Sequence, residues 1–481
     1  MDRSGKETRL ESADFRVWAR EGFPGRTQVP KRVIVVGAGM AGLVAALELQ
    51  AAGHEPVVLE AQGRVGGRIL TMREPFTDGL YAEAGAMRLP RSHDLTMAYV
   101  ERFGLRTYDF TMGNPQGYSF LHGQRLRIGD VEANPALLDY PFADHERGRT
   151  YGQLWAAALA PLVKRLEENP ESAWSEIVAS HDQYSTREFL EANNWSEGAI
   201  ELFGLLADQE ALMNSSFLEL FREEAGNYYT DMVQIEGGMD ELPRAFLPEL
   251  RRRIRFGAKM VALDQSPDGV TVHYQTAGGR FSETGDYAIL TVPFPVLRHM
   301  EVLKPFGRPK QRAIRQLHYD ASAKVFVQCR SRFWEEVDGI FGGGSFTDLP
   351  IRVVFYPEHG RETGRGVLLA SYTWAEDAQR WGSLSPADRI VQALENLACI
   401  HPRIAEEFEV GASKMWHDDE FAGGAFALFE PGQQTLLHDH IVGPEGRVFF
   451  AGEHTSLCHA WIQGAIESGL RAASEVHQRS P

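Results

Sequence analysis

The first clear pattern in the chain is a pair of short apolar runs separated by a stretch of helical character. Val33–Val36 and Val57–Leu59 are continuous apolar runs, which is typical of strands buried on both faces. The residues between them favour a helix that ends near Ala52. A buried strand, a helix and a second buried strand form a βαβ unit, the usual beginning of a parallel sheet.

Later apolar runs predict further strands. Tyr287–Val292 and Arg447–Phe450 have the same continuous apolar character, so we expect them in the same buried sheet. Ser266–Gly269 carries Pro-Asp-Gly between two strand-like runs, which indicates a hairpin turn. A second sheet is predicted from the runs Ala323–Gln328, Ile351–Tyr356 and Val367–Thr373.

The stretch from residue 131 to 225 has a different pattern, with apolar residues at helical spacing and few β-branched residues. It predicts a helical insertion, whose clearest helices are Ala156–Leu166, Thr186–Ala192 and Glu197–Leu206. Helices are also expected at Arg389–Ala398, at Gln463–His477 and, within a polar arm of residues 1–30, at Phe15–Arg20.

Composition narrows the class of protein. The net charge of −17, from 49 basic and 66 acidic residues, argues against binding to nucleic acid or to an anionic membrane surface. No apolar run reaches the ~18 residues that a membrane helix needs. The three cysteines are far apart, which favours a reducing compartment over a disulfide framework. A signal peptide at Lys31-Arg32 is the alternative, but its apolar run starts deep in the chain, so we expect a cytoplasmic protein.

A glycine pattern follows the first strand, G-A-G-M-A-G at residues 37–42. Gly37 permits a tight turn, Gly39 lets the backbone approach a pyrophosphate, and Gly42 allows helix and strand to pack closely. Glu60 ends the second strand, where a carboxylate accepts hydrogen bonds from an adenosine ribose. These residues predict a dinucleotide site. A cationic, glycine-rich loop follows at residues 64–68 and can hold the second phosphate of a longer, buried cofactor.

Further motifs occur in order along the chain. They are V-I-V-V-G-A-G-M-A-G-L (33–43), V-L-E-A-Q-G-R-V-G-G-R (58–68), E-A-G-A-M-R-L-P (83–90), E-G-G-M-D-E-L-P (236–243), T-V-P-F-P-V-L-R (291–298), G-G-A-F-A-L-F-E-P-G-Q (423–433), F-F-A-G-E-H-T (449–455) and H-A-W-I-Q-G-A-I-E-S-G (459–469). This series resembles the flavin amine oxidases, and within them the L-amino-acid oxidases. The resemblance implies FAD as cofactor and reoxidation of the reduced flavin by O₂. The flavin is expected to be noncovalent, because Ala425 stands where some monoamine oxidases have a flavin-bonded cysteine.

Pattern and resemblance together predict an α/β protein in three parts. A Rossmann-like, discontinuous FAD-binding domain is expected from residues 31–71, 233–322 and 443–481. A substrate-binding domain with a mixed β-sheet is expected from residues 1–30, 72–135 and 323–442, and a helical domain from residues 136–232.

The resemblance also implies roles for single residues. Arg88 matches the family arginine that grips the substrate carboxylate, for which a guanidinium offers parallel donors. Tyr372 matches a second donor to that carboxylate, and Lys324 matches a lysine that holds a water near flavin N5. Trp461 and Phe426 match the aromatic positions on either side of the substrate amine. For each of these residues an ordinary place in the core or at the surface is the alternative.

The remaining candidates are less distinctive. Ala460 leaves room beside Trp461, and Trp416 and Glu210 are candidates for the side-chain pocket, together with Trp374, Asp208 and Glu224. The predicted cofactor contacts are Gly37, Gly39, Met40, Ala41, Gly42, Glu60, Ala61, Arg64, Gly67, Arg68, Gly85, Ala86, Met87, Arg88, Met260, Val261, Gly452, Glu453 and Ile462. A metal site at Glu453, His454, Cys458 and His459 is a rival interpretation, but the spacing fits no common pattern, so no metal is expected.

The resemblance therefore implies oxidative deamination of a free L-amino acid, with hydride transfer from Cα to flavin N5 and Lys324 and Trp461 as the catalytic residues. The motifs contain no evident base for the substrate amine. The alternatives are an amine or polyamine oxidase, an amino-acid 2-monooxygenase or dehydrogenase on the same fold, and a flavin-stabilised binding protein. The expected partners are the amino acid and O₂, and the resemblance also allows a homodimer.

Overall fold

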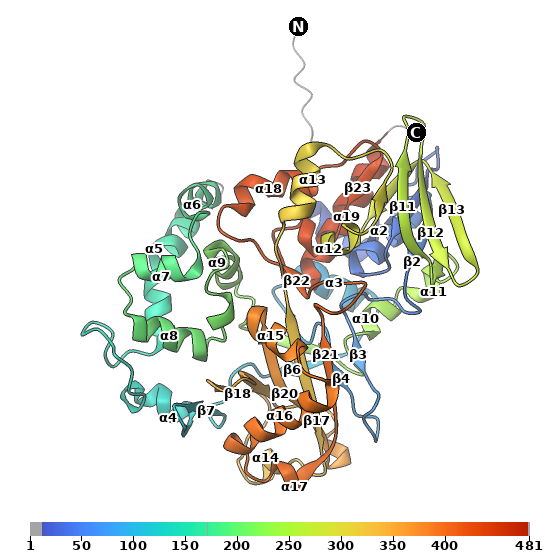
Figure 1. Cartoon of the computed structure of the whole chain (residues 1–481). Coiled ribbons are helices and arrows are strands. Elements are labelled where there is room, and N and C mark those ends of the chain that lie inside the picture. Colours follow the sequence, from blue (N-terminus) through green and yellow to red (C-terminus); the bar gives the residue numbers. More distant parts are fainter. Residues whose placement is uncertain (1–11, 171, 480–481) are drawn as a thin grey trace.

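The structure is a computed structural model that describes residues 12–170 and 172–479 (Figure 1). The first 11 residues of the predicted substrate-binding segment 1–30, residue 171 of the helical segment, and residues 480–481 of the last FAD-binding segment lie outside the described residues.

A five-stranded parallel sheet forms the centre of the nucleotide-binding part. Its order is β10-β2-β1-β14-β23. The strands are β1 (Arg32–Val36), β2 (Glu55–Glu60), β10 (Ile254–Phe256), β14 (Tyr287–Leu290) and β23 (Val448–Phe450). The continuous apolar runs thus lie in one sheet, although they come from the beginning, the middle and the end of the chain.

Both faces of this sheet are covered, which explains why its strands are mostly apolar. On one face lie the helices α2 (Met40–Ala51) and α19 (Ile462–Gln478). On the other face packs a second sheet, of order β13-β12-β11-β15. Its strands are β11 (Lys259–Gln265), β12 (Val270–Thr276), β13 (Gly279–Gly285) and β15 (Glu301–Val302). The predicted turn at residues 266–269 joins β11 to β12.

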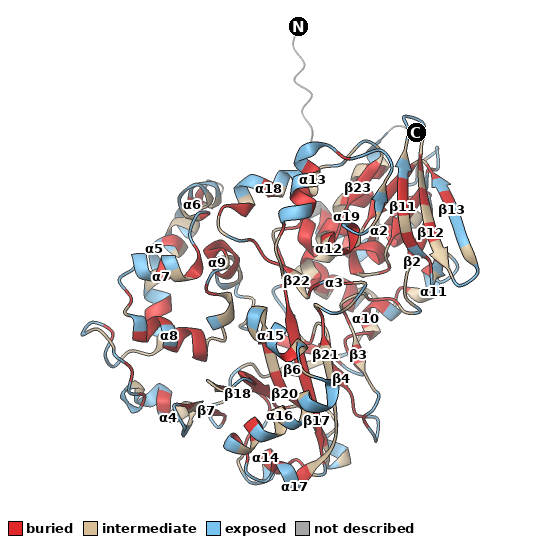
Figure 2. Cartoon of the chain, viewed as in Figure 1, coloured by how far each residue is buried: buried red, intermediate tan, exposed pale blue. Residues whose placement is uncertain are grey.

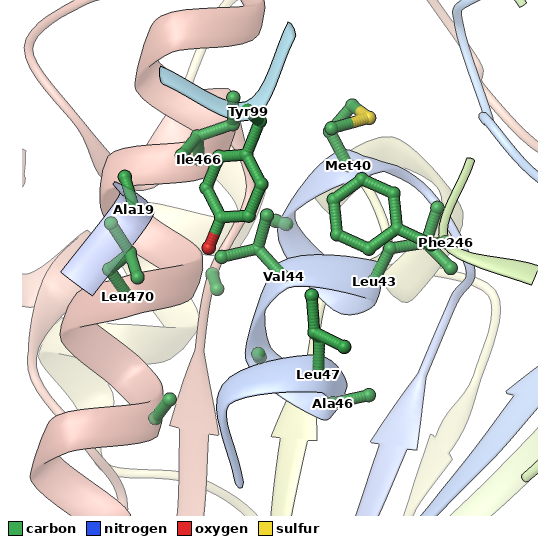
Figure 3. Packing of buried hydrophobic residues seen from close by; sticks show 14 of the residues in the cluster. Ala19, Met40, Leu43, Val44, Ala46, Leu47, Tyr99, Phe246, Ile466 and Leu470 are labelled. Carbon is green, nitrogen blue, oxygen red and sulfur yellow. The ribbon is translucent and has the colours of Figure 1, made fainter. Parts of the chain in front are cut away.

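Helices α2 and α19 pack at very short range. A Cβ on Gly469 would lie 2.6 Å from the carbonyl oxygen of Ala41, so only glycine lets the two backbones approach this closely. Figure 3 shows the apolar side chains of α2 between Ile466 and Leu470 on one side and Phe246 on the other. Burial of these side chains fixes the helix whose first turn borders the glycine loop.

A seven-stranded mixed sheet, shown at the bottom of Figure 1, forms the second large part. Its order is β21-β17-β20-β19-β18-β7-β8, with only the β18–β7 pair parallel. The strands are β7 (Tyr118–Leu121), β8 (Gln124–Arg127), β17 (Ser322–Cys329), β18 (Gly344–Thr347), β19 (Val353–Phe355), β20 (Gly366–Trp374) and β21 (Phe408–Met415). Strand β17 is buried along its whole length (Figure 2), with helices α14 (Phe333–Glu336), α15 (Ala375–Gly382), α16 (Pro386–Ile400) and α17 (Ile404–Glu407) nearby.

The helical insertion has a hydrophobic core of its own, built mainly from its longer helices. Its helices are α4 (Ile128–Ala133), α5 (Tyr151–Glu168), α6 (Ala173–His181), α7 (Thr186–Ala192), α8 (Glu197–Leu206) and α9 (Phe217–Ala225). The N-caps Thr150 and Ser185 both form capping boxes, which explains why α5 and α7 begin where they do.

The other elements are short. They are α1 (Ser12–Glu21), β3 (Thr71–Met72), β4 (Ala82–Glu83), β5 (Leu89–Pro90), α3 (Asp94–Arg102), β6 (Thr107–Phe110), β9 (Met232–Ile235), α10 (Glu241–Arg244), α11 (Leu247–Leu250), α12 (Phe294–Leu297), α13 (Arg308–Gln316), β16 (Tyr319–Asp320), β22 (Phe426–Ala427), α18 (Gln433–Val442) and the 3₁₀ turns η1 (Pro135–Leu137), η2 (Glu210–Leu212), η3 (Arg361–Thr363) and η4 (Glu453–Thr455). No helix among the described residues is long and apolar enough to cross a bilayer.

The α/β fold class is confirmed, with two differences in detail. Strand β14 ends at Leu290 and not at Val292, because its neighbours also end there: Leu290 pairs with Val36 and with Phe450. Strand β19 is shorter than predicted, because Arg352 takes a left-handed conformation and the register with β20 shifts after Val353. The three domain boundaries stay a prediction.

Candidate active site

The glycine loop between β1 and α2 forms one end of a long cavity. Gly37 has φ of +107°, and a Cβ on Gly42 would lie 2.0 Å from the carbonyl oxygen of Gly37. A Cβ on Gly39, by contrast, would meet no atom within 4 Å, because this glycine lines the cavity. The loop therefore presents bare backbone at the N-terminus of α2, where an anion is stabilised.

Glu60 lies beside this loop at the end of β2. Its two carboxylate oxygens accept the amide N–H groups of Ala38 and Gln62, each at 2.7 Å. Burial raises the pKa of Glu60, although these hydrogen bonds oppose the shift. The side chain also lines the cavity, so its free lone pairs can accept ribose hydroxyls.

A buried ion pair lies farther along the cavity. Arg68 Nη1 lies 2.7 Å from Glu453 Oε1 and also donates to the carbonyl of Ala425 at 2.9 Å. Glu453 Oε2 in turn accepts the amide N–H of Ala460 at 3.1 Å. Ala460 has φ of +64°, which is uncommon for a residue with a side chain, and the turn brings Trp461 to the start of α19. The N-terminus of α19 therefore faces the cavity, with Ile462 in the wall.

Arg88 is a half-buried cation, two of whose nitrogen atoms are buried without a hydrogen-bond partner. Its Nε and Nη1 are buried and form no hydrogen bond, while the guanidinium lies 5.6–5.8 Å from the ring centres of Phe110, Tyr229 and Phe355. An unpaired guanidinium in an aromatic surround is costly to bury. Since Arg88 lines the cavity, its free donors mark a place for an anionic group of a ligand.

Lys324 and Tyr372 face each other across β17 and β20, close to Arg88. Lys324 Nζ donates to the carbonyls of Gly85 at 2.7 Å and Glu83 at 3.0 Å and lies 4.7 Å from the Tyr372 ring centre. Burial, reinforced by the charge of Arg88, lowers the pKa of Lys324 to about 7. Trp416 is held beside them by its indole N–H, which donates to the carbonyl of Ala84 at 2.7 Å.

The helical insertion supplies the opposite wall of the cavity. Glu219 and Glu223, one turn apart on α9, both line it. Glu223 accepts the indole N–H of Trp461 at 2.6 Å and the hydroxyl of Tyr229 at 2.8 Å. Neither acid is among the predicted site residues. The signal that could have found them is the i, i+4 spacing of two carboxylates on a helix face that also carries Leu220.

Comparison with known proteins is consistent with this geometry. The family model of flavin containing amine oxidoreductases matches residues 40–477. The chain belongs to this family. YobN of Bacillus subtilis (strain 168), provisionally named an L-amino-acid oxidase, is 42% identical over 94% of this chain and 96% of its own. The L-amino-acid oxidase of Vipera ammodytes ammodytes is 37% identical over the whole of both chains.

Solved structures show the same fold. A putrescine oxidase variant redesigned in cofactor binding superposes with a TM-score of 0.75 at 23% identity, over 95% of this chain and all of the other. Wild-type putrescine oxidase bound to putrescine superposes with a TM-score of 0.73 at 22% identity and the same coverage.

As a flavin-containing amine oxidoreductase, the protein uses FAD as its cofactor, and the residues of the cavity fit FAD. The open backbone at Gly39, the carboxylate of Glu60 and the Arg68–Glu453 pair all line this cavity. They suit a pyrophosphate, a ribose and the polar chain between them. Ala425 lines the cavity and has no thiol, so no thioether to the flavin can form at this position.

Most predicted site residues lie together in the cavity wall. They are Gly37, Gly39, Met40, Ala41, Glu60, Ala61, Gly67, Arg68, Gly85, Ala86, Met87, Arg88, Met260, Lys324, Tyr372, Trp374, Trp416, Phe426, Gly452, Glu453, Ala460, Trp461 and Ile462.

Other predicted site residues lie outside the wall. Gly42 packs beneath the loop, as its spacing suggests, and Val261 faces away from Met260 because neighbouring strand residues point to opposite sides. The Arg64 guanidinium donates hydrogen bonds to carbonyls of its own loop, including that of Gly67 at 2.7 Å. Glu210 points away and pairs with Arg352.

Two further candidates from the helical insertion, Asp208 and Glu224, also lie outside the wall. No group of three metal-ligating side chains occurs among the described residues. Of the rival metal candidates, Glu453 is paired with Arg68, and His459 Nδ1 lies 2.9 Å from Glu219.

Proposed function

We propose that the chain is an L-amino-acid oxidase, which converts a free L-amino acid, O₂ and water to a 2-oxo acid, ammonia and H₂O₂. The observation that carries the proposal is Arg88, a guanidinium with buried, unbonded N–H groups in the cavity wall. An amine substrate has no group to pair with it, whereas the carboxylate of an amino acid does. The full-length relatives named as L-amino-acid oxidases support the same assignment.

The residues around Arg88 position the substrate. Tyr372, next to Lys324 on the neighbouring strand, can donate a second hydrogen bond to the carboxylate. Trp461 and Phe426 in the wall leave an apolar space for the amine and Cα, bordered by the small side chain of Ala460. Bound FAD supplies the hydride acceptor and the reaction with O₂. The protein fixes the amino acid so that Cα faces that acceptor.

Replacing Arg88 by alanine tests this proposal. The loss of two charge-assisted hydrogen bonds, at about 1.5 kcal/mol each, should raise KM for a good amino-acid substrate by roughly 100-fold or more. The content of bound FAD should stay close to wild type, because the cofactor contacts elsewhere are intact. Steady-state peroxide production and the flavin absorbance of the purified variant measure both quantities. A KM equal to that of the wild type would remove the amino-acid assignment.

The amine oxidase alternative has one observation in its favour, the acidic pair Glu219 and Glu223, which would suit a polyamine. A 2-monooxygenase would yield an amide and a dehydrogenase no peroxide, so product analysis separates these alternatives.

The free cysteines Cys329, Cys399 and Cys458 support a cytoplasmic location. We also propose that the protein forms a homodimer, as the family resemblance allows.

A further inference from the structure

The reaction needs a base, because the substrate amine is protonated near neutral pH and an ammonium group holds back the electrons that must leave with the hydride. The side chains that form the cavity wall are therefore the place to search. The carboxylates in that wall are Glu60, Glu219, Glu223, Asp419 and Glu453.

Four of these carboxylates are already engaged. Glu60 is held by two backbone amides at the glycine loop. Glu219 lies 2.9 Å from His459 Nδ1 and 3.7 Å from Arg222 Nη1. Asp419 pairs with Lys414 and Glu453 with Arg68. Glu60 is thus held by backbone amides, and the other three have a basic side chain as partner.

Glu223 differs from all of them. Its hydrogen-bond donors are neutral, the indole N–H of Trp461 at 2.6 Å and the hydroxyl of Tyr229 at 2.8 Å. No cation forms an ion pair with it in the part of the chain that the structure describes. The Tyr229 ring also contacts the Arg88 guanidinium, so Glu223 and Arg88 border the same part of the cavity.

We infer that Glu223 is the base of the reaction and takes the proton from the α-ammonium group of the bound amino acid. This inference rests on the proposed function. An N–H bond of the substrate breaks and an O–H bond forms on Glu223. The electron pair of the broken bond stays on nitrogen, so that the amine is neutral and can support the loss of hydride from Cα. The Tyr229 ring centre lies 5.8 Å from the Arg88 guanidinium carbon and 5.8 Å from the Trp461 ring centre. Glu223, which accepts hydrogen bonds from Tyr229 and Trp461, therefore lies near the place proposed for the substrate.

The electrostatic surroundings agree with this role. Burial raises the pKa of Glu223 to about 7, and the hydrogen bonds from Trp461 and Tyr229 oppose the shift. A base with a pKa near 7 is ionised in half or more of the molecules at neutral pH and can still hold a proton. Its titratable neighbours are Glu219, Glu224, Tyr228, Tyr229, Tyr372 and Cys458.

Neither the three tyrosines nor Cys458 gains or loses a proton near pH 7. Burial raises the pKa of Cys458 to about 12 and those of the three tyrosines above their usual values. The pKa of Glu219 is lowered by His459 and Arg222 against the effect of burial, so this acid is ionised in the same range.

The test is the rate of anaerobic flavin reduction by an L-amino acid as a function of pH, for the wild type and for Glu223→Gln. Glutamine keeps the size of the side chain and an oxygen acceptor for Trp461. The wild-type rate should rise with pH through about 7, because the base must be ionised. In Glu223→Gln the rate at pH 7 should fall roughly 100-fold. It should approach the wild-type rate only at high pH, where the free substrate is already neutral.

Glu224→Gln is the matched control, since Glu224 follows on the same helix but lies outside the cavity wall. It should keep the wild-type profile. Infrared difference spectra of the holoenzyme give a second readout: a carboxyl band that titrates near pH 7 in the wild type should be absent from Glu223→Gln and present in Glu224→Gln.

Distinct outcomes would overturn the inference. A reactive Glu223→Gln variant with the wild-type pH profile would show that another group takes the proton. A loss confined to lysine and arginine as substrates would make Glu223 a binder of cationic side chains. A wild type that no amino acid reduces would end the proposed function itself, and the inference with it.

Discussion

Arg88 and Lys324 are two basic side chains in the cavity wall, and their hydrogen bonds differ. Lys324 donates to two backbone carbonyls, which leaves one of its three N–H groups for the cavity. The buried Nε and Nη1 of Arg88 have no acceptor at all. The unpaired N–H groups of Arg88 are explained by binding of a ligand. Lys324 already has most of its hydrogen bonds, so a smaller role, such as holding a water molecule, explains it better.

Lys324→Met tests that local task. The resemblance to the flavin amine oxidases assigns this lysine to a water near the flavin, so its loss should slow reoxidation by O₂ by roughly 10-fold or more. Anaerobic reduction by substrate should change much less, because Arg88 and Tyr372 remain. Stopped-flow measurement of the two half-reactions separates these effects. Equal slowing of both would indicate a structural role for the lysine.

Single residues were predictable where a motif carried them. Arg88, Trp461 and Glu453 stand in short stretches of distinctive sequence, and all three line the cavity. Glu223 stands in no such stretch, and its role depends on a helix whose position against Trp461 is a tertiary property. The cofactor role of Arg64 stays a prediction, and nothing in the loop sequence shows that its guanidinium donates to the carbonyls of its own loop.

At the scale of elements, the turn from β1 into α2 combines two glycines with different tasks. Position 42 requires glycine because the carbonyl oxygen of Gly37 leaves no space for a side chain there. Position 39 requires glycine because a side chain there would project into the cavity that holds the cofactor. The same substitution at the two positions should therefore damage different properties of the protein.

Gly39→Ala should fold normally but lose most of its FAD, because the added methyl group meets no protein atom and projects into the cavity. Gly42→Ala should be destabilised by about 1–3 kcal/mol through overpacking against the Gly37 carbonyl. Thermal unfolding of the apoproteins and flavin content after purification measure the two effects. Equal losses of FAD without any difference in apoprotein stability would contradict this division of tasks.

Elements with a long, uniform pattern were predicted well. Helices α7 and α8 have the predicted ends, and β17, buried along its length, extends the predicted run by one residue on each side. The three-stranded sheet of order β5-β9-β6 was not predicted. Its strands have two to four residues and show no periodicity of their own, so their pairing depends on tertiary structure.

At the scale of the whole molecule, the cavity is a product of long-range assembly. Its walls come from the glycine loop, from the motif around Arg88, from α9 of the helical insertion, from β17 and β20, and from the turn before α19. The central sheet pairs β1 with β14 from the middle of the chain, and β14 with β23 from near its end. Local patterns predicted the strands, but their order and the shape of the cavity depend on these distant pairings.

The central claim is that the cavity selects a substrate by its carboxylate, and anaerobic reduction of the yellow holoenzyme tests it most directly. Each common L-amino acid is compared with its D-enantiomer and with the amine that lacks the carboxylate. At least one L-amino acid should bleach the flavin roughly 100-fold faster than its matching amine, and its D-enantiomer should be nearly inert. Reduction by amines at rates equal to or above those of every L-amino acid would contradict the account.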